Sequence, residues 1–301
     1  MRIYGKQPLT FDQQLNLLKQ RGMTVADDAH ALHTLATVSY YRLSGYWYPL
    51  RQVSPSSGEF LNPFRPNTTF SQVIELYEFD RALRSLVLDA IERIEISIRT
   101  QMTYHFGHTH GAFGHTDNNN FHPRFDHHKW LSSIESEAGR SRDQFIQHYR
   151  VKYMGFPRLP VWMATEVMSL GSLSFWYKGM VTADKRKVSD FYQLHPKRLQ
   201  NWLHVITYVR NVCAHHSRLW NRDLAISPDR IREPDWLPPN TPRNDRIFYV
   251  FLMLRHLLKA INPTDNWHIQ VNELATPIAT VEGYRKAMGM PVEWKTHPLW
   301  R

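Results

Sequence analysis

The longest uninterrupted helical pattern in the chain, residues 69–107, is the feature that most constrains its fold. Thr69-x-x-Gln72 fits a capping box at the start of the pattern, and no breaker follows before Gly107. Apolar side chains recur at helical spacing at Ile74, Leu76, Phe79, Leu83, Leu86, Val87, Ala90, Ile91, Ile94 and Ile98. We therefore expect one helix over this whole stretch, which is long for a globular protein.

The rest of the 301-residue chain reads mainly as further helices. Helical patterns cover residues 10–21, 26–38, 129–137, 143–153, 161–178, 184–194, 197–220 and 246–260. Turn-forming residues predict loops at 54–67 and 107–123, a proline-rich crossing follows residue 223, and a less regular tail follows residue 260. Alternating strand patterns are nearly absent, so the sequence predicts an all-α protein.

The net charge and the cysteine content limit which binding partners and which cellular compartment we expect for this chain. The chain has 37 Lys and Arg against 27 Asp and Glu, a net charge of +10 that favours polyanions, although a merely basic soluble protein has the same balance. Cys213 is the single cysteine, which excludes an intramolecular disulfide and a thiolate metal cluster. The N-terminus lacks the apolar core of a signal peptide, and no apolar run is long enough to span a bilayer, so we expect a cytoplasmic protein without membrane contact.

The segment with the clearest chemical potential is 197–220, treated as one helix. A helical wheel places one apolar face at Trp202, Val205, Ile206, Val209, Val212, Cys213, His216 and Trp220. The opposite face carries His204, Thr207, Tyr208, Asn211, His215 and Arg218. Arg210 lies on the flank, about 140° from His215 at 100° per residue. The wheel thus predicts an accessible His215 and a buried His216.

Arg210 and His215 suit RNA cleavage without a metal. A histidine can move a proton to or from a ribose 2′-hydroxyl or a 5′-oxygen. An arginine can hold the scissile phosphate and stabilise developing charge, while Asn211 can orient the imidazole or contact phosphate. One histidine supplies half of an acid–base pair, and the angular offset also favours a site shared by two protomers. The alternative is that both are surface residues with ordinary polar contacts.

Four segments together resemble the AbiD/AbiF-like abortive-infection (Abi) family. Residues 210–222 (RNVCAHHSRLWNR) resemble its signature, and residues 39–47 (SYYRLSGYW) look like its N-terminal motif. Residues 77–84 (YEFDRALR) and 91–99 (IERIEISIR) are similar to further family motifs. The matches are ordered along residues 6–222 and so cover most of the chain.

The resemblance implies a HEPN-like helical bundle with additional N- and C-terminal helices. HEPN ribonucleases use Arg-x4–6-His, often with Asn after the Arg, which makes Arg210 and His215 catalytic and Asn211 supporting. His216 fits the wider spacing and ranks second because the wheel buries it; Tyr208 is a further supporting candidate. The implied boundaries are an N-terminal segment packing on the core (1–68), the HEPN-like core (69–222) and a C-terminal crossing plus helix (223–301).

The function implied is that of a toxin-like, metal-independent endoribonuclease without a cofactor, which acts in bacteriophage defence by abortive infection. The resemblance also implies that the substrate is RNA and that two copies of the chain form a homodimer with a composite active site. A small RNA or a protein antitoxin would inhibit the enzyme. A non-catalytic RNA-binding or regulatory module on the same scaffold is the alternative.

Several arginines are candidates for RNA contacts. Arg218 shares the His215 face and Arg222 follows one turn later, which suits guidance of phosphates. Arg99 and His105 give a second match to the motif, as Arg99-x5-His105, and Arg99 lies four residues after Glu95, a spacing that favours an ion pair on a helix. Arg99 therefore belongs either to a structural ion-pair network or to a substrate contact or second site.

Two other segments leave alternatives open. The aromatic stretch Tyr40–Tyr48 either fills the core or an interface or stacks on bases. Arg42 is its most exposed expected member and a further candidate for RNA binding. Histidines gather at His105, His108, His110, His115, His122, His127 and His128. With Asp126 they are competent metal ligands, but their spacing matches no helical metal pair, so we expect a flexible, RNA-facing loop and no metal.

Overall fold

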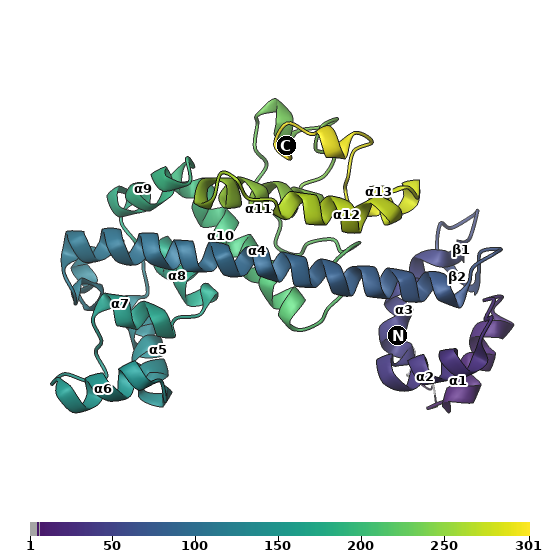
Figure 1. Ribbon diagram of the computed structural model, residues 1–301, viewed down its shortest axis with the longest axis horizontal. Coiled ribbons are helices and arrows are strands. Elements are labelled where there is room, and N and C mark those ends of the chain that lie inside the picture. The colour runs from purple at the N-terminus through teal and green to yellow at the C-terminus, as the bar shows by residue number, and fades with distance from the viewer. Residues whose placement is uncertain (1–4, 6) are drawn as a thin grey trace. The chain divides into compact units, whose positions relative to one another are not determined.

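A single helix, α4 (Phe70–His110), runs through both compact units of the computed structural model (Figure 1). The structure describes residue 5 and residues 7–301, and the units are Met1–Ala82 and Leu83–Arg301. The predicted capping box is present, because Gln72 N donates to Thr69 Oγ1 (3.2 Å) and Thr69 N donates to Gln72 Oε1 (3.0 Å). The expected long helix is thus confirmed, three residues longer than its predicted end at Gly107.

The all-α class is also confirmed, since helices dominate and the described strands form one small sheet. The first unit contains α1 (Phe11–Gln20), α2 (Asp28–Val38), α3 (Tyr40–Trp47), β1 (Arg51–Val53), β2 (Phe60–Phe64) and the start of α4. The second contains the rest of α4, then α5 (His127–Arg140), α6 (Gln144–Lys152), α7 (Val161–Ala164), α8 (Leu170–Gly179), α9 (Thr182–Phe191), α10 (Pro196–Ala214), α11 (Ile247–Ile261), α12 (Trp267–Ala279) and α13 (Glu282–Ala287). The boundaries expected at 68 and 222 stay a prediction.

In the N-terminal unit, the aromatic stretch packs rather than projecting as a row of rings. Tyr46 and Trp47 are buried, and the Tyr46 hydroxyl donates to the buried Asp80 carboxylate at 2.7 Å. Tyr46 also lies edge-on to Tyr77, with ring centroids 5.4 Å apart. The two family-like motifs at 39–47 and 77–84 therefore meet in one core. Tyr41, 90% exposed, remains available to a partner.

The short sheet corrects the loop expected at residues 54–67. β1 and β2 pair antiparallel, with Arg51 opposite Phe64 and Val53 opposite Phe60. Pro63 obscured the strand pattern, but a two-stranded sheet has only edge strands, where a missing N–H is tolerated. The tip of the hairpin, with Gly58 at φ +69°, keeps the predicted turn character.

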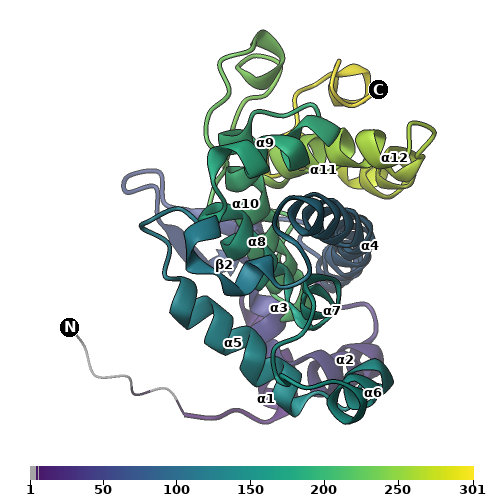
Figure 2. The ribbon, with the colours of Figure 1, turned by 90° about the vertical axis from the view of Figure 1, so that its left-hand side faces the viewer.

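In the C-terminal unit, aromatic rings join α4 to the helices beside it. Figure 2 shows α8 and α10 next to α4. Trp176 of α8 lies 5.2 Å from Phe106 of α4 and 5.8 Å from Trp130 of α5, measured between ring centroids. Ser97 of α4 is hydrogen-bonded to the Tyr192 hydroxyl at 2.7 Å. These contacts fix the frame on which α10 is held.

Three helix predictions need correction. The helix expected over 161–178 is broken into α7, a 3₁₀ turn and α8, because Ser169 is extended and its hydroxyl caps the new helix by accepting from Ser172 N (3.2 Å). The tail expected to be less regular forms α12 and α13, with Pro277 inside α12 having obscured the pattern. The helix expected over 197–220 ends at Ala214.

Within the described residues, no helix is long and apolar enough to cross a membrane.

Asp265 connects α11 and α12 to α4, which Figure 1 shows side by side. Its carboxylate accepts hydrogen bonds from Arg93 of α4 and from Trp267 N (3.0 Å), and lies 3.8 Å from the buried Arg255 guanidinium. The Trp267 indole donates to the carbonyl of Leu86 at 2.8 Å. A buried carboxylate thus neutralises two arginines at the joint.

Asp265→Asn should lower the free energy of unfolding by about 3 kcal/mol, because it leaves the Arg255 charge buried without its counterion. Asp89→Asn is the matched control: Asp89 pairs with the same Arg93 but is 55% exposed, so we expect a loss below about 1 kcal/mol. The free energy of unfolding of both variants is measured by denaturant titration. Equal losses of unfolding free energy in the two variants would contradict the role given to Asp265.

Candidate functional site

The Arg210–His216 segment lies where α10 ends, and the way the helix ends sets its geometry. Ser217 N donates to Val212 O and His216 N to Cys213 O, both at 2.9 Å, while His216 adopts φ +55°. These two hydrogen bonds and the left-handed conformation of His216 form a Schellman motif. Glycine usually occupies the left-handed position of this motif. A histidine held there is a departure from ordinary backbone preference, of the kind that gathers at functional sites.

This closure overturns part of the helical-wheel prediction. His216 is exposed, not buried, because the chain leaves the helix two residues before it. His215 is the C-cap residue, and its N–H still donates to the Asn211 carbonyl at 3.0 Å, so the helix continues up to this residue and the expected offset of about 140° from Arg210 remains. Both histidines are therefore open to solvent at the end of α10.

Arg210 and Asn211 are also exposed and lie in contact. Arg210 Nη1 is 3.4 Å from Asn211 Oδ1, and His215 N donates to the Asn211 carbonyl at 3.0 Å. The Asn211 side chain thus contacts Arg210, whereas its link to His215 is the ordinary backbone bond of the helix. Among the described residues, Arg210 forms no ion pair with a carboxylate and no hydrogen bond with His215. The guanidinium remains open to an anionic ligand.

The other predicted residues near the motif have mainly structural contacts. The Tyr208 hydroxyl accepts from Ala225 N at 3.3 Å, which ties α10 to the segment that follows. Arg222 Nε donates to the carbonyl of Arg218 at 2.7 Å, and both side chains are half-buried. Arg42 is exposed on α3, in the other unit. The RNA-binding roles of these arginines stay predictions.

Arg99 and His105 face different neighbours. Arg99 is 14% exposed and donates to Glu95 Oε1 (2.9 Å) and to the carbonyl of Met168 (3.0 Å). His105 lies toward α9, where burial and the Lys187 charge lower the pKa of its imidazole. These contacts favour the ion-pair interpretation of Arg99, which secures the start of α8.

Part of the histidine-rich segment is packed into the fold: His115 and His127 are buried, whereas His108, His122 and His128 are exposed. His110 Nε2 lies 2.7 Å from Asp184 Oδ2, and His127 Nε2 lies 2.8 Å from the carbonyl of the buried His115. Burial lowers the pKa of His115 to about 4, which keeps it neutral. In the part of the chain that the structure describes, no three His, Cys, Asp or Glu side chains are grouped to hold a metal ion.

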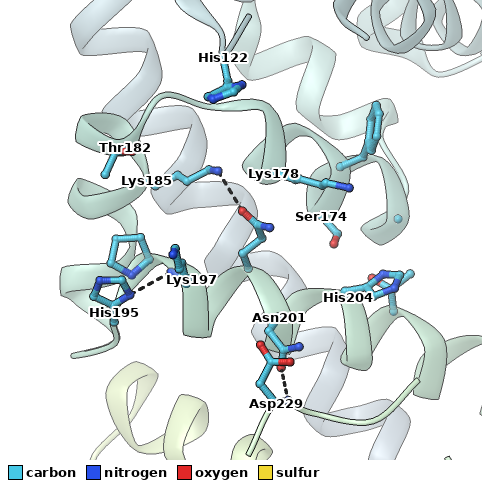
Figure 3. Close-up of a pocket in the computed structure, with 15 residues that line it drawn as sticks. His122, Ser174, Lys178, Thr182, Lys185, His195, Lys197, Asn201, His204 and Asp229 are labelled. Atoms are coloured by element: carbon cyan, nitrogen blue, oxygen red, sulfur yellow. Dashed lines mark hydrogen bonds between the residues drawn. The ribbon is translucent and has the colours of Figure 1, made fainter. Parts of the chain in front are cut away.

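Sequence reasoning missed a basic cleft that borders α10. The cleft, of about 790 Å³, lies between α8, α9 and the first half of α10 and includes Lys178, Lys185, Lys197 and His204 (Figure 3). One signal was present in the sequence, because His204 shares the polar side of the wheel with Asn211. The lysines of α8 and α9 gave none, since only the tertiary fold brings them to α10.

Comparison with known proteins supports one family. Residues 33–221 match the family model described as Abi-like protein, and this range includes Arg210 and His215. Neither the curated proteins nor the solved structures give a match to the chain.

His216→Gly should be more stable to unfolding than His216→Val by about 1–3 kcal/mol. Both variants remove the imidazole, so their difference depends mainly on the left-handed backbone, which glycine adopts without strain and a β-branched residue resists. Denaturant unfolding compares the two; equal stability would show that His216 does not hold this conformation in solution.

Acid should destabilise the fold between pH 6.5 and 4 through His115. Unfolded His115 binds its proton near 6.5 and folded His115 only near 4, so its stabilising contribution is complete above pH 6.5 and is lost as the pH falls toward 4. The contribution amounts to about 3 kcal/mol. His115→Gln should flatten the pH dependence of the unfolding free energy, whereas exposed His128→Gln should not; identical slopes in wild type and His115→Gln would refute the assignment.

Proposed function

Because the chain belongs to the Abi-like protein family, we propose that it is a metal-independent endoribonuclease that acts in bacteriophage defence by abortive infection. The observation that carries the proposal is the exposed end of α10, where the Arg210 guanidinium contacts the Asn211 amide, His215 follows at the C-cap, and the arginine has no carboxylate partner among the described residues. An exposed guanidinium and an exposed imidazole at one helix end supply the two kinds of group that phosphodiester cleavage requires, one to stabilise charge and one to transfer a proton.

In the proposed reaction, the ribose 2′-oxygen attacks the adjacent phosphorus, and the bond from phosphorus to the 5′-oxygen breaks. His215 accepts the 2′-hydroxyl proton or donates a proton to the leaving 5′-oxygen. Arg210 holds the non-bridging oxygens and stabilises the charge that develops on them. Asn211 positions Arg210 through the 3.4 Å contact.

One imidazole performs only one of the two proton transfers at a time. We propose that a homodimer supplies the second, with two copies of the motif facing one RNA strand. His216 is the alternative second group, since the structure exposes it next to His215. A small RNA or a protein antitoxin that covers the end of α10 would restrain the activity.

Arg210→Ala and His215→Ala should each lower RNA cleavage by the purified protein at least about 100-fold, because each removes a charge or proton-transfer group from the transition state. His216→Ala should lower it less than His215→Ala. EDTA should leave cleavage unchanged. Exposed Arg142→Ala and His128→Ala, outside the motif, are the matched controls and should retain wild-type activity.

Full cleavage by either motif variant, with the fold verified by circular dichroism, would refute the assignment. A wild-type protein that binds RNA but does not cut it would instead identify a non-catalytic RNA-binding module.

A further inference from the structure

The cleft beside α10 has a cationic lining that its own carboxylates do not neutralise. Three lysines line it, Lys178 from α8, Lys185 from α9 and Lys197 from α10 (Figure 3). Within the described range, none of the three forms an ion pair, and Asp229 is the only acidic residue of the lining. Burial and the nearby Lys178 charge lower the pKa of the Lys185 ammonium. An anion in the cleft would offset that repulsion.

Backbone groups add to this positive potential. Thr182 and Pro196, the first residues of α9 and α10, both line the cleft, but Pro196 has no N–H and the His195 side chain caps α10 by accepting from Lys197 N at 3.3 Å. The available N–H groups are therefore those of α9. The N-terminus of α9 has no side-chain cap, so its first N–H groups have no side-chain acceptor. Helix N-termini carry partial positive charge and bind phosphate groups through such N–H groups. Ammonium groups and helix dipoles therefore act in the same direction.

The cleft is longer than a site for a single phosphate needs to be. A second hollow of about 350 Å³ shares His122, Phe175, Lys178, Lys185 and Gln200 with it and adds Arg124, Phe125 and Asp126. The Phe175 side chain is 38% exposed and lines both hollows, which offers a face on which a base can stack. The shape and the mixture of cations with an aromatic ring suit a single nucleic-acid strand.

The lining of α10 points toward the proposed catalytic centre. Lys197, Gln200, His204 and Thr207 line the cleft at steps of three or four residues, and the next position on this stripe is Asn211. The distance from Lys197 to Asn211 along the helix axis is about 21 Å, at 1.5 Å per residue. A strand lying on this stripe would reach the end of α10 after several phosphates.

We propose that the cleft between α8, α9 and α10 binds the backbone phosphates of single-stranded RNA and leads the strand to Arg210 and His215. The proposal rests on the function proposed above for the end of α10. It assigns Lys178, Lys185 and Lys197 to phosphate binding and Phe175 to base stacking.

The test measures binding separately from cleavage. A fluorescent single-stranded RNA of 20 nucleotides is titrated with the full-length His215→Ala protein in EDTA, and anisotropy is recorded at several salt concentrations. In that background, a triple variant carries Lys178→Gln, Lys185→Gln and Lys197→Gln. The matched control carries Lys129→Gln, Lys152→Gln and Lys295→Gln, three exposed lysines outside the cleft with the same change in net charge.

The cleft variant should bind at least about 10-fold more weakly than the control. Its slope of log affinity against log salt should fall by about 2, because each phosphate that a lysine neutralises contributes about 0.7 to the slope for a single strand. Phe175→Leu should weaken binding without changing the salt slope, because stacking releases no counterions. Thermal unfolding checks that both triple variants are folded.

Equal affinities and salt slopes in the two triple variants would overturn the proposal, even if wild-type protein cleaves RNA. Adenosine monophosphate that binds as tightly as the 20-mer would also overturn it, by identifying a small-anion site. A loss of binding confined to the cleft variant would support it, and would do so even if the wild-type protein proved unable to cleave.

Discussion

The burial of α4 on several of its sides is the constraint on which the rest of the structure depends. In the N-terminal unit, the Asp80 carboxylate of α4 accepts a hydrogen bond from the Tyr46 hydroxyl. In the C-terminal unit, the same helix binds α12 through Arg93 and packs Phe106 against Trp176 of α8. In proteins most of the stability of a helix comes from packing of its apolar face rather than from its intrinsic propensity, and α4 is packed in this way. The family-like motif at residues 77–84 lies at the first of these contacts.

The residues proposed to be catalytic lie at the exposed end of α10, a helix that packs beside α4. Buried apolar residues such as Val209 and Val212 fix the helix against the unit, whereas Arg210 and Asn211 between them are exposed. The left-handed His216 then stops the helix directly after the C-cap residue His215, and both histidines are exposed. The basic cleft lies along the same helix, upstream of this end. One helix, α10, therefore carries the proposed catalytic groups and lines part of the proposed binding surface.

Sequence reasoning predicted the parts of the molecule that local patterns specify. The capping box at Thr69 and Gln72 and the apolar period after it are local signals, and α4 is present as expected. The end of α10 was missed because its closure uses His216, where the usual signal is glycine. Arg210, Asn211 and His215 were candidates from the sequence, and the structure shows them exposed, although their catalytic roles remain proposals.

The cleft could not be predicted from local patterns, because its lysines come from three helices. Lys178, Lys185 and Lys197 each sit in a segment that reads as an ordinary amphipathic helix. Only the packing of α8 and α9 on α10 places them around one hollow. Net positive charge indicated a polyanionic partner but not where on the surface it would bind.

The chemistry at the ends of the cleaved RNA tests the central claim most directly. A defined oligonucleotide is incubated with the purified chain in EDTA, and the new termini are identified by mass spectrometry. Attack by the ribose hydroxyl, assisted by His215 and Arg210, predicts a 2′,3′-cyclic phosphate on one fragment and a 5′-hydroxyl on the other. A 3′-hydroxyl paired with a 5′-phosphate would contradict it, since those ends require water and not the ribose as the nucleophile.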